Sequence, residues 1–244
     1  MGQMKRALVT GSSRGIGREM AIGLARDGYE VIVHYAENHE RAEQTKQIIE
    51  RNGGVATLVG GDLCDASNAD HVMEQAGNVD VLVLNASLQI RRPWLKITGE
   101  EYQKQMTCNF YSSLRLIQLA VPYMQRQKWG RIVAIGSVQE RKPHPDMLVY
   151  SASKAAQTNM VQSLAVQLAG DGITVNSVAP GVVYTDRNIQ ALSDPEYAKQ
   201  VIASIPVGFY GEPGDIAGIV RLLCSDAGRY ITGQSIYVDG GKSL

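Results

Sequence analysis

The sequence predicts one α/β domain built on a doubly wound parallel sheet of about seven strands, with helices on both faces. Three observations support this. Short apolar runs alternate with longer amphipathic segments along all 244 residues, the apolar runs are nearly continuous, and no linker or repeat divides the chain. Alternating strands and helices are typical of a parallel sheet, and strands buried on both faces are apolar throughout. We therefore expect a single domain over 1–244.

The predicted strands are short runs rich in β-branched and other apolar residues. Such residues fit a pleated surface that is covered on both sides. The runs lie at 6–10, 30–35, 55–60, 80–85, 130–137, 173–180 and 235–240. The segments that follow them contain Gly, Asn, Ser, Asp and Arg, as expected at a rim where a doubly wound sheet binds its ligand.

The predicted helices are amphipathic stretches between these strands. They lie at 15–27, 39–51, 66–76, 100–127, 150–169 and 213–225. The segment 186–212 has mixed helical character with Gly and Pro at its far end, which favours a lid over the substrate, although an ordinary pair of surface helices has the same pattern.

Composition excludes several classes of protein. Lys+Arg and Asp+Glu both number 24, so no charge excess favours nucleic acid or an anionic membrane. The three cysteines are far apart and lack metal-ligand spacing, which indicates reduced thiols rather than disulfides or a zinc site. The N-terminus carries no apolar signal segment, and no apolar run approaches about 18 residues. We expect a soluble, cytoplasmic protein without a membrane span.

A glycine-rich loop follows the first predicted strand. The stretch "TGSSRGIG" places Gly11, Gly15 and Gly17 between that strand and a helix. Glycines there permit a tight turn and let backbone N–H groups approach a pyrophosphate at the helix N-terminus. A glycine-rich turn can be merely structural, but its position in the first βα unit of a doubly wound chain favours a dinucleotide site.

The stretch "YSASKAAQ" places Tyr150 and Lys154 four residues apart in a predicted helix. This spacing puts both side chains on one helix face. At about 4 Å and a dielectric constant of about 20, the attraction between an ammonium and a phenolate is roughly 4 kcal/mol, which strongly favours the ionised phenol. The pair can therefore serve as a general acid/base, although Tyr and Lys at this spacing also occur by chance.

These motifs together resemble the short-chain dehydrogenase/reductase family over essentially the whole chain. The matching positions, in the family's order and spacing, are Thr10 to Gly17, Asp62-Leu63, Asn85-Ala86, Asn109, Ser137, Tyr150 with Lys154, and Pro180-Gly181 with Thr185. The resemblance implies a single Rossmann-like domain and an oxidoreductase that exchanges hydride between a nicotinamide and a carbonyl or secondary alcohol. It implies no metal.

The resemblance also implies a role for each catalytic residue. Tyr150 would exchange a proton with the substrate oxygen, and Lys154 would favour its ionised form and hold the nicotinamide ribose. Ser137 would orient the substrate oxygen, and Asn109 would hold a water that links Lys154 to solvent. Taken singly, Ser137 could cap a strand end and Asn109 could be a satisfied buried group.

The implied cofactor site gathers residues from most strand ends. It comprises Gly11, Ser13, Arg14, Gly15, Ile16, Gly17, Tyr35, Asp62, Leu63, Asn85, Ala86, Ser87, Tyr150, Lys154, Pro180, Gly181, Val183 and Thr185. One departure is "LNAS" at 84–87, where the family often has Asn-Asn-Ala-Gly. Ser87 replaces a glycine, so we expect adjusted packing without loss of cofactor binding.

The residues after the second strand bear on the choice between the two nicotinamides. An acid at its end would bond the ribose 2′-OH of NAD, but this chain has Tyr35 there. Arg14 could meet a 2′-phosphate, whereas Glu37 could repel it. We expect NADP to be preferred over NAD.

The substrate loops are polar and bulky. They supply Gln89, Arg91, Trp94, Gln139 and His144, which suit a small sugar, polyol, or hydroxy or keto acid. Solvated surface loops have the same composition.

Other substrates and roles remain open. Reduction of a 3-oxoacyl carrier protein is the main alternative. Such reductases commonly carry a basic residue where this chain has Asp171, although Lys128 and Arg131 remain on the preceding element. Steroids or other carbonyls are further candidates. An inactive binding or structural protein is a remote alternative, because every catalytic residue is present.

The helices at 100–127 and 150–169 carry apolar residues on several sides, which suggests packing against another subunit. The family resemblance implies a homotetramer.

Overall fold

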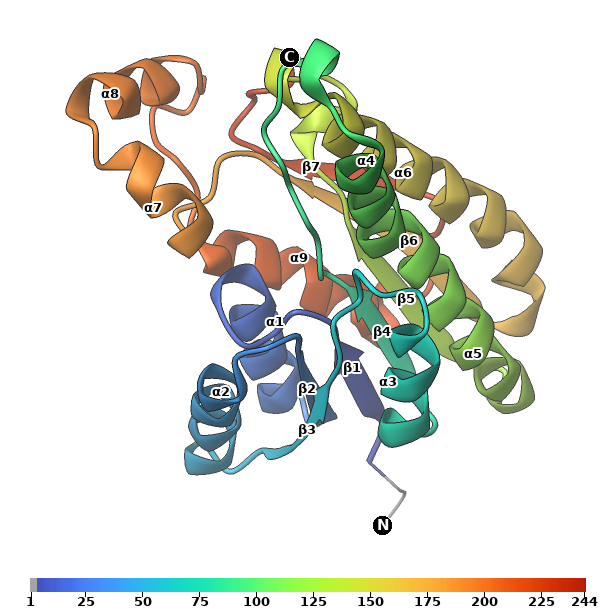
Figure 1. Cartoon of the computed structure of the whole chain (residues 1–244). Coiled ribbons are helices and arrows are strands. Elements are labelled where there is room, and N and C mark those ends of the chain that lie inside the picture. Colours follow the sequence, from blue (N-terminus) through green and yellow to red (C-terminus); the bar gives the residue numbers. More distant parts are fainter. Residues whose placement is uncertain (1–3) are drawn as a thin grey trace.

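The structure is a computed structural model that describes residues 4–244, leaving aside the side chains at 187, 190 and 191. Its centre is a seven-stranded parallel sheet in the order β3-β2-β1-β4-β5-β6-β7 (Figure 1). The strands are β1 (Arg6–Val9), β2 (Glu30–Tyr35), β3 (Val55–Gly60), β4 (Val81–Leu84), β5 (Gly130–Ile135), β6 (Ile173–Pro180) and β7 (Ser235–Val238). The predicted fold class is confirmed.

The strands alternate their side chains between two buried faces. Ala7 and Val9 pack on one side with α1 (Gly15–Arg26), α2 (His39–Arg51) and α9 (Pro213–Cys224). Leu8 and its neighbours pack on the other side with α3 (Asn68–Ala76), α5 (Ser112–Gln127) and α6 (Leu148–Leu168). Since side chains point alternately to opposite faces of a strand, an uninterrupted apolar run supplies both cores at once.

The strand order reverses between β1 and β4, which are hydrogen-bonded neighbours. Loops that leave such neighbouring strands in opposite directions open a crevice beyond the carboxyl ends of the sheet. The turns after β1 and β4 are therefore placed where a dinucleotide can bind.

The predicted helix at 100–127 is divided into three parts. It begins as α4 (Gly99–Met106), widens into a π-helical turn at Thr107–Tyr111 and continues as α5. Thr98 and Glu101 form a capping box that starts α4. Single π-helical turns insert an extra residue and are frequent at functional sites, and this one carries the buried Asn109.

The segment after β6 forms two short helices, α7 (Asp186–Leu192) and α8 (Pro195–Ala203). They project beyond the body of the domain in orange (Figure 1). In residues 4–244 no helix is both long enough and apolar enough to cross a bilayer.

Candidate functional site

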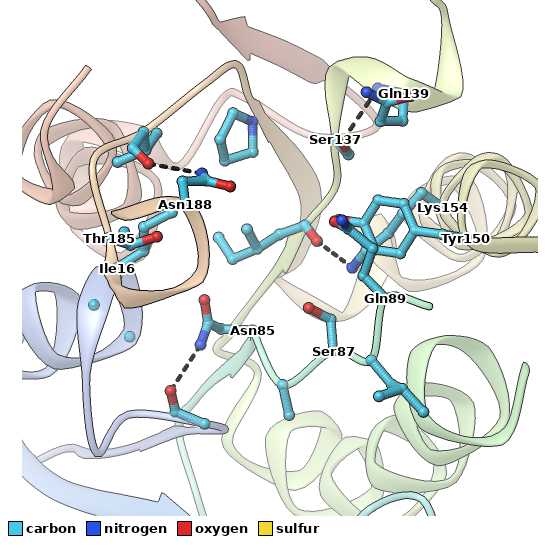
Figure 2. Close-up of a pocket in the computed structure, with 18 of the residues that line it drawn as sticks. Ile16, Asn85, Ser87, Gln89, Ser137, Gln139, Tyr150, Lys154, Thr185 and Asn188 are labelled. Atoms are coloured by element: carbon cyan, nitrogen blue, oxygen red, sulfur yellow. Dashed lines mark hydrogen bonds between the residues drawn. The ribbon is translucent and has the colours of Figure 1, made fainter. Parts of the chain in front are cut away.

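A cavity of about 770 Å³ opens beyond the carboxyl ends of the strands. Pockets of this size hold cofactors and small molecules. Its lining contains 22 of the predicted site residues, several of which Figure 2 shows converging on one space. They are Gly11, Ser13, Arg14, Gly15, Ile16, Gly17, Asp62, Leu63, Asn85, Ala86, Ser87, Gln89, Arg91, Ser137, Gln139, His144, Tyr150, Lys154, Pro180, Gly181, Val183 and Thr185.

The glycine loop forms one wall of the cavity. Gly11 and Gly15 have φ values of +63° and +56°, the left-handed region that favours glycine. A Cβ on Gly17 would lie 2.3 Å from the carbonyl oxygen of Gly11, so only glycine fits there. Asn85 fixes the loop, because its Nδ2 donates to the carbonyls of Thr10, at 2.9 Å, and Gly11, at 3.0 Å. The loop is thus a cradle that closely matches the needs of a pyrophosphate.

His34 supports the same loop from beneath. The backbone N–H of Gly11 donates to Nδ1 of His34 at 3.0 Å, so Nδ1 carries no proton. Nε2 therefore carries the proton and donates to the carbonyl of Gly61 at 2.9 Å. Burial lowers the pKa of His34 from 6.5 to about 4, which keeps the ring neutral and the bridge intact near pH 7. Sequence reasoning missed His34, whose partners lie far away in the chain.

Tyr150 and Lys154 lie one turn apart near the start of α6, and both are buried. Nζ of Lys154 is 6.0 Å from the centre of the Tyr150 ring. The same Nζ donates to the carbonyl of Ile135, at 2.6 Å, and to Oε1 of Gln157, at 3.1 Å. Ser137 ends the neighbouring strand, and its Oγ accepts from the backbone N–H of Gln139 at 3.2 Å. Figure 2 shows Ser137, Tyr150 and Lys154 around one side of the cavity.

Asn109 lies behind the cavity wall rather than in it. Its Nδ2 donates to the carbonyl of Leu88 and to Oγ of Ser153, both at 2.9 Å, and its Oδ1 accepts from the N–H of Leu88 at 2.8 Å. The side chain therefore holds the loop after β4 against α6. The side chain of Asn109 is therefore buried and hydrogen-bonded, and its role in holding a water for Lys154 stays a prediction.

Two further predicted residues also lie outside the lining. The ring of Tyr35 covers Gly60 and meets the ring of His39 edge-on, with centroids 5.4 Å apart. The side chain of Trp94 is 65% exposed. Alternation along β2 turns Tyr35 to the sheet face covered by α1, α2 and α9, where its ring lies over Gly60 of β3. Ala36 and Glu37 line the cavity in its place.

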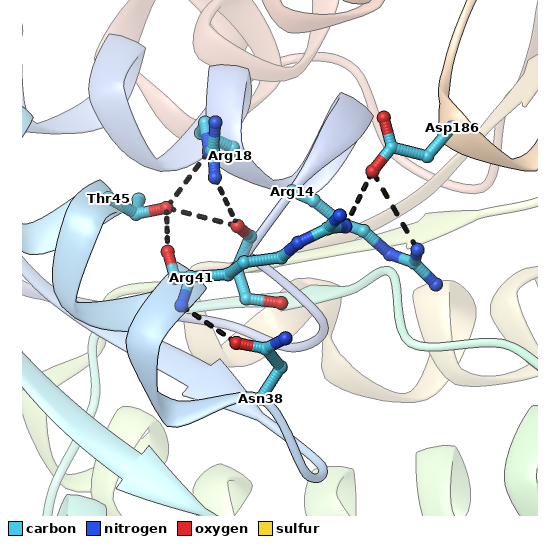
Figure 3. A network of polar contacts seen from close by, with 7 residues as sticks. Arg14, Arg18, Asn38, Arg41, Thr45 and Asp186 are labelled. Carbon is cyan, nitrogen blue, oxygen red and sulfur yellow. Dashed lines mark hydrogen bonds and ion pairs between the residues drawn. The ribbon is translucent and has the colours of Figure 1, made fainter.

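A basic cluster flanks the glycine loop (Figure 3). Oδ2 of Asp186, the first residue of α7, lies 2.6 Å from Nη1 of Arg41 and 3.8 Å from Nη1 of Arg14. Asn38 caps α2 by accepting from the backbone N–H of Arg41. Sequence reasoning found Arg14 but missed Arg41, which reaches this place from the first turn of α2.

Charge is distributed unevenly around the cavity. The acids among the described lining side chains are Glu37, Asp62 and Asp186. Glu37 follows β2, Asp62 follows β3, and Asp186 begins α7. Another part of the lining is formed by the loops after β4 and β5 and by the C-terminal tail. We call it the polar end, and it consists of Gln89, Arg91, Gln139, His144 and Lys242.

Within the polar end, two cations differ in their surroundings. Arg91 makes no hydrogen bond or ion pair with the described residues. Lys242 donates to the hydroxyl of Ser204. The pKa of Lys242 is lowered mainly by partial burial and further by the positive charge of Lys142 nearby. Gln139 and His144 order their own loop, since Oε1 of Gln139 accepts from the backbone N–H of His144 at 2.6 Å. Lys242 was not predicted from the sequence.

Known proteins resemble this chain along its whole length. The sequence model of a family described as enoyl-(acyl carrier protein) reductase matches residues 11–243. The 3-oxoacyl-(acyl-carrier-protein) reductase FabG of Staphylococcus aureus is 39% identical over 248 aligned residues, which cover 100% of both chains. This chain belongs to the short-chain dehydrogenase/reductase family.

Solved structures agree with this assignment. The 3-oxoacyl (acyl-carrier-protein) reductase of Agrobacterium tumefaciens with NADP bound has a TM-score of 0.93 at 38% identity, over 97% of this chain and 93% of that one. A putative gluconate dehydrogenase from the same organism also has a TM-score of 0.93, at 32% identity, over 99% and 96%. This short-chain dehydrogenase/reductase is therefore an oxidoreductase that uses a nicotinamide cofactor on a CH–OH or C=O group.

Proposed function

We propose that this enzyme interconverts the carbonyl and the secondary alcohol of a small polar hydroxy or keto acid, with NADP(H) as its preferred cofactor. The observation that carries the proposal is the charge of the cavity. Its described acids lie away from the polar end, where Arg91 and Lys242 present two cations. A carboxylate that is desolvated in such a pocket gains a charge-assisted hydrogen bond, and Arg can bind it in bidentate fashion.

The chemistry rests on three side chains next to the polar end. When bound, the nicotinamide supplies or accepts the hydride at the reacting carbon. Tyr150 donates a proton to the carbonyl oxygen during reduction and takes one from the hydroxyl during oxidation. Ser137 hydrogen-bonds the same oxygen and orients it, while the ammonium of Lys154 favours the ionised form of Tyr150 and holds the ribose.

The rest of the cavity fits the cofactor. The cradle of Gly11, Gly15 and Gly17 leaves space for the pyrophosphate against the N-terminus of α1. Arg14 and Arg41 aim two guanidiniums at one carboxylate oxygen of Asp186, a place where a 2′-phosphate would be held in the same way. Glu37 and Asp186 together balance the two positive charges, so the support for NADP comes from the convergence of two guanidiniums on one anion position and not from a net positive charge. The pair therefore supports NADP over NAD.

Reduction of a 3-oxoacyl carrier protein is a second candidate, favoured by the 39% identity to the S. aureus reductase. An acidic carrier protein needs basic residues at the site mouth. Here Nζ of Lys128 lies 2.5 Å from Oδ1 of Asp171, so a carboxylate neutralises the base that would face the carrier. For this reason we rank the carrier-protein substrate second.

Two expectations of assembly and motion belong to the same proposal. Helices α7 and α8 form the lid, since Leu192, Tyr197 and Val201 of this segment line the cavity.

Exposed apolar side chains on α6, such as Leu148 and Val166, support packing against other subunits of a homotetramer.

A turnover assay tests the proposal. NADPH absorbance is followed after mixing the enzyme with a keto-aldonate, an acetoacetyl thioester or a ketosteroid, each at several concentrations. We expect kcat/KM to be highest for the keto-aldonate. A higher value for the thioester would reverse the order of the two candidates, and a higher value for the steroid would reject both.

A further inference from the structure

A glutamine of α6 is buried beside the catalytic pair. Gln157 lies three residues after Lys154 and is 1% exposed. Its Oε1 accepts from Nζ of Lys154 at 3.1 Å, and its Nε2 donates to Oγ of Ser113 at 3.0 Å. The hydroxyl of Ser113 then donates to the carbonyl of Asn109 at 3.2 Å. A chain of hydrogen bonds thus joins the lysine to the π-helical turn.

These contacts determine how the ammonium of Lys154 is oriented. An ammonium has three N–H groups in fixed tetrahedral directions, and the carbonyl of Ile135 accepts one of them at 2.6 Å. With Ile135 alone, the group could rotate about that hydrogen bond. Gln157 supplies a second fixed acceptor, so the direction of the third N–H is set as well. Because Ser113 holds the amide of Gln157, the acceptor itself cannot turn away.

We propose that Gln157 is a positioning residue that aims the ammonium of Lys154 at Tyr150 and at the nicotinamide ribose. This inference rests on the proposed roles of Tyr150 and Lys154. A carboxamide neither gains nor loses a proton near neutral pH, so Gln157 acts by fixing a charge and not by carrying protons. Titratable groups that face Lys154 are Tyr150 on its own helix and Cys108 in the π-helical turn, and both are kept in the variants below.

The test uses Gln157→Leu, which removes the acceptor while leaving the Ser113–Asn109 hydrogen bond in place. Since hydrogen bonds to charged groups are the strong ones, we expect kcat at pH 7 to fall about 10- to 100-fold and Kd for NADPH to rise about 3- to 10-fold. We also expect the alkaline limb of the pH profile of reduction to move to higher pH, because a misdirected ammonium favours the ionised phenol less.

The matched control is Gln167→Leu, a glutamine on the same helix that bonds only to Ser163 among the described residues. It should leave kcat, Kd and the pH profile unchanged. If Gln157→Leu fails to fold, Ser113→Ala releases the amide of Gln157 without adding volume and should shift the same quantities by a smaller factor.

Unchanged NADPH affinity and a pH profile that superimposes on that of the parent enzyme would overturn the inference, even if thermal stability fell. NADPH affinity is measured without substrate. An enzyme that turns over none of the tested carbonyls therefore contradicts the substrate assignment, while the Gln157 test is still read from the cofactor.

Discussion

The carboxylate of Asp186 lies 2.6 Å from the guanidinium of Arg41, although the two residues are 145 positions apart. This ion pair joins the start of α7 to the first turn of α2 across the edge of the cavity (Figure 3). Arg14 approaches the same carboxylate oxygen at 3.8 Å. Two guanidiniums thus converge on one carboxylate oxygen. In the proposed preference for NADP, the 2′-phosphate would bind these guanidiniums and Asp186 would compete with it.

Arg41→Gln should therefore weaken NADPH binding selectively. We expect Kd for NADPH to rise about 10-fold and Kd for NADH to change less than about 2-fold, since one charge-assisted contact is lost. Asp186→Asn should have the opposite effect and tighten NADPH. Titration by NADPH and NADH fluorescence measures both, with Arg51→Gln at the far end of α2 as the control. Equal losses for the two cofactors would mean that Arg41 does not recognise the 2′-phosphate.

His34 predicts a loss of stability in mild acid. Its pKa is about 4 in the folded chain and about 6.5 when unfolded, so above pH 6.5 both states are neutral. Between pH 6.5 and 4 the unfolded chain binds a proton that the folded chain does not, and stability falls as the pH falls. The full loss, reached below pH 4, is about 3 kcal/mol.

Urea unfolding at pH 7 and pH 4.5 measures this effect. His34→Gln is the comparison, because an amide can still accept from Gly11 and donate to Gly61 but does not titrate. The difference in stability between the two pH values should be smaller in the variant. The same difference in both proteins would assign the acid sensitivity to other groups.

Tyr150→Phe should remove the acid/base group while leaving the cavity filled. We expect kcat to fall about 100- to 10,000-fold, the usual contribution of general acid–base catalysis, with NADPH affinity within a few-fold of the parent. Tyr230→Phe is the matched control, since Tyr230 is 98% exposed. Turnover that survives in Tyr150→Phe at more than a tenth of the parent rate would remove Tyr150 from its proposed role.

Gly17→Ala tests the cradle. Its Cβ would lie 2.3 Å from the carbonyl oxygen of Gly11 and 2.6 Å from Nδ2 of Asn85, so the loop must shift. Overpacking of this kind costs about 1–3 kcal/mol, and NADPH binding should weaken with it. Gly218→Ala, in α9 with nothing within 4 Å of the added carbon, should leave stability the same or raise it. Thermal unfolding with and without NADPH separates the two variants.

Much of the fold followed from the sequence because its signals are local. Apolar runs predicted the strands, and local spacing indicated the glycine loop and the pair of Tyr150 and Lys154. Ser137 was identified only through the resemblance to the family. The π-helical turn was missed, since the helical pattern is continuous from 100 to 127. The hydrogen-bond partners of Asn109 in that turn, Leu88 and Ser153, lie far from it in the sequence.

Residues brought in from distant segments were harder to find. Lys242 reaches the cavity from the C-terminal tail, and Arg41 of α2 pairs with Asp186, which lines the cavity. His34 is recognised only through its contacts with Gly11 and Gly61. Tyr35 and Trp94 show the reverse, since a sequence position at a strand end or in a loop does not fix the direction of its side chain. Alternation turns Tyr35 to the sheet face covered by α1, α2 and α9, and Trp94 faces solvent.

The most direct test of the proposed function compares one keto acid with its uncharged methyl ester. Steady-state kcat/KM with NADPH is measured for both compounds in the parent enzyme, in Arg91→Gln and in Arg92→Gln. Arg92 pairs with Glu101 and is not among the residues that line the cavity, so it serves as the control. We predict that the acid is preferred at least about 10-fold, and that Arg91→Gln alone removes most of this preference, as expected for the loss of a charged hydrogen bond. Equal or better turnover of the ester by the parent enzyme would contradict an anionic substrate.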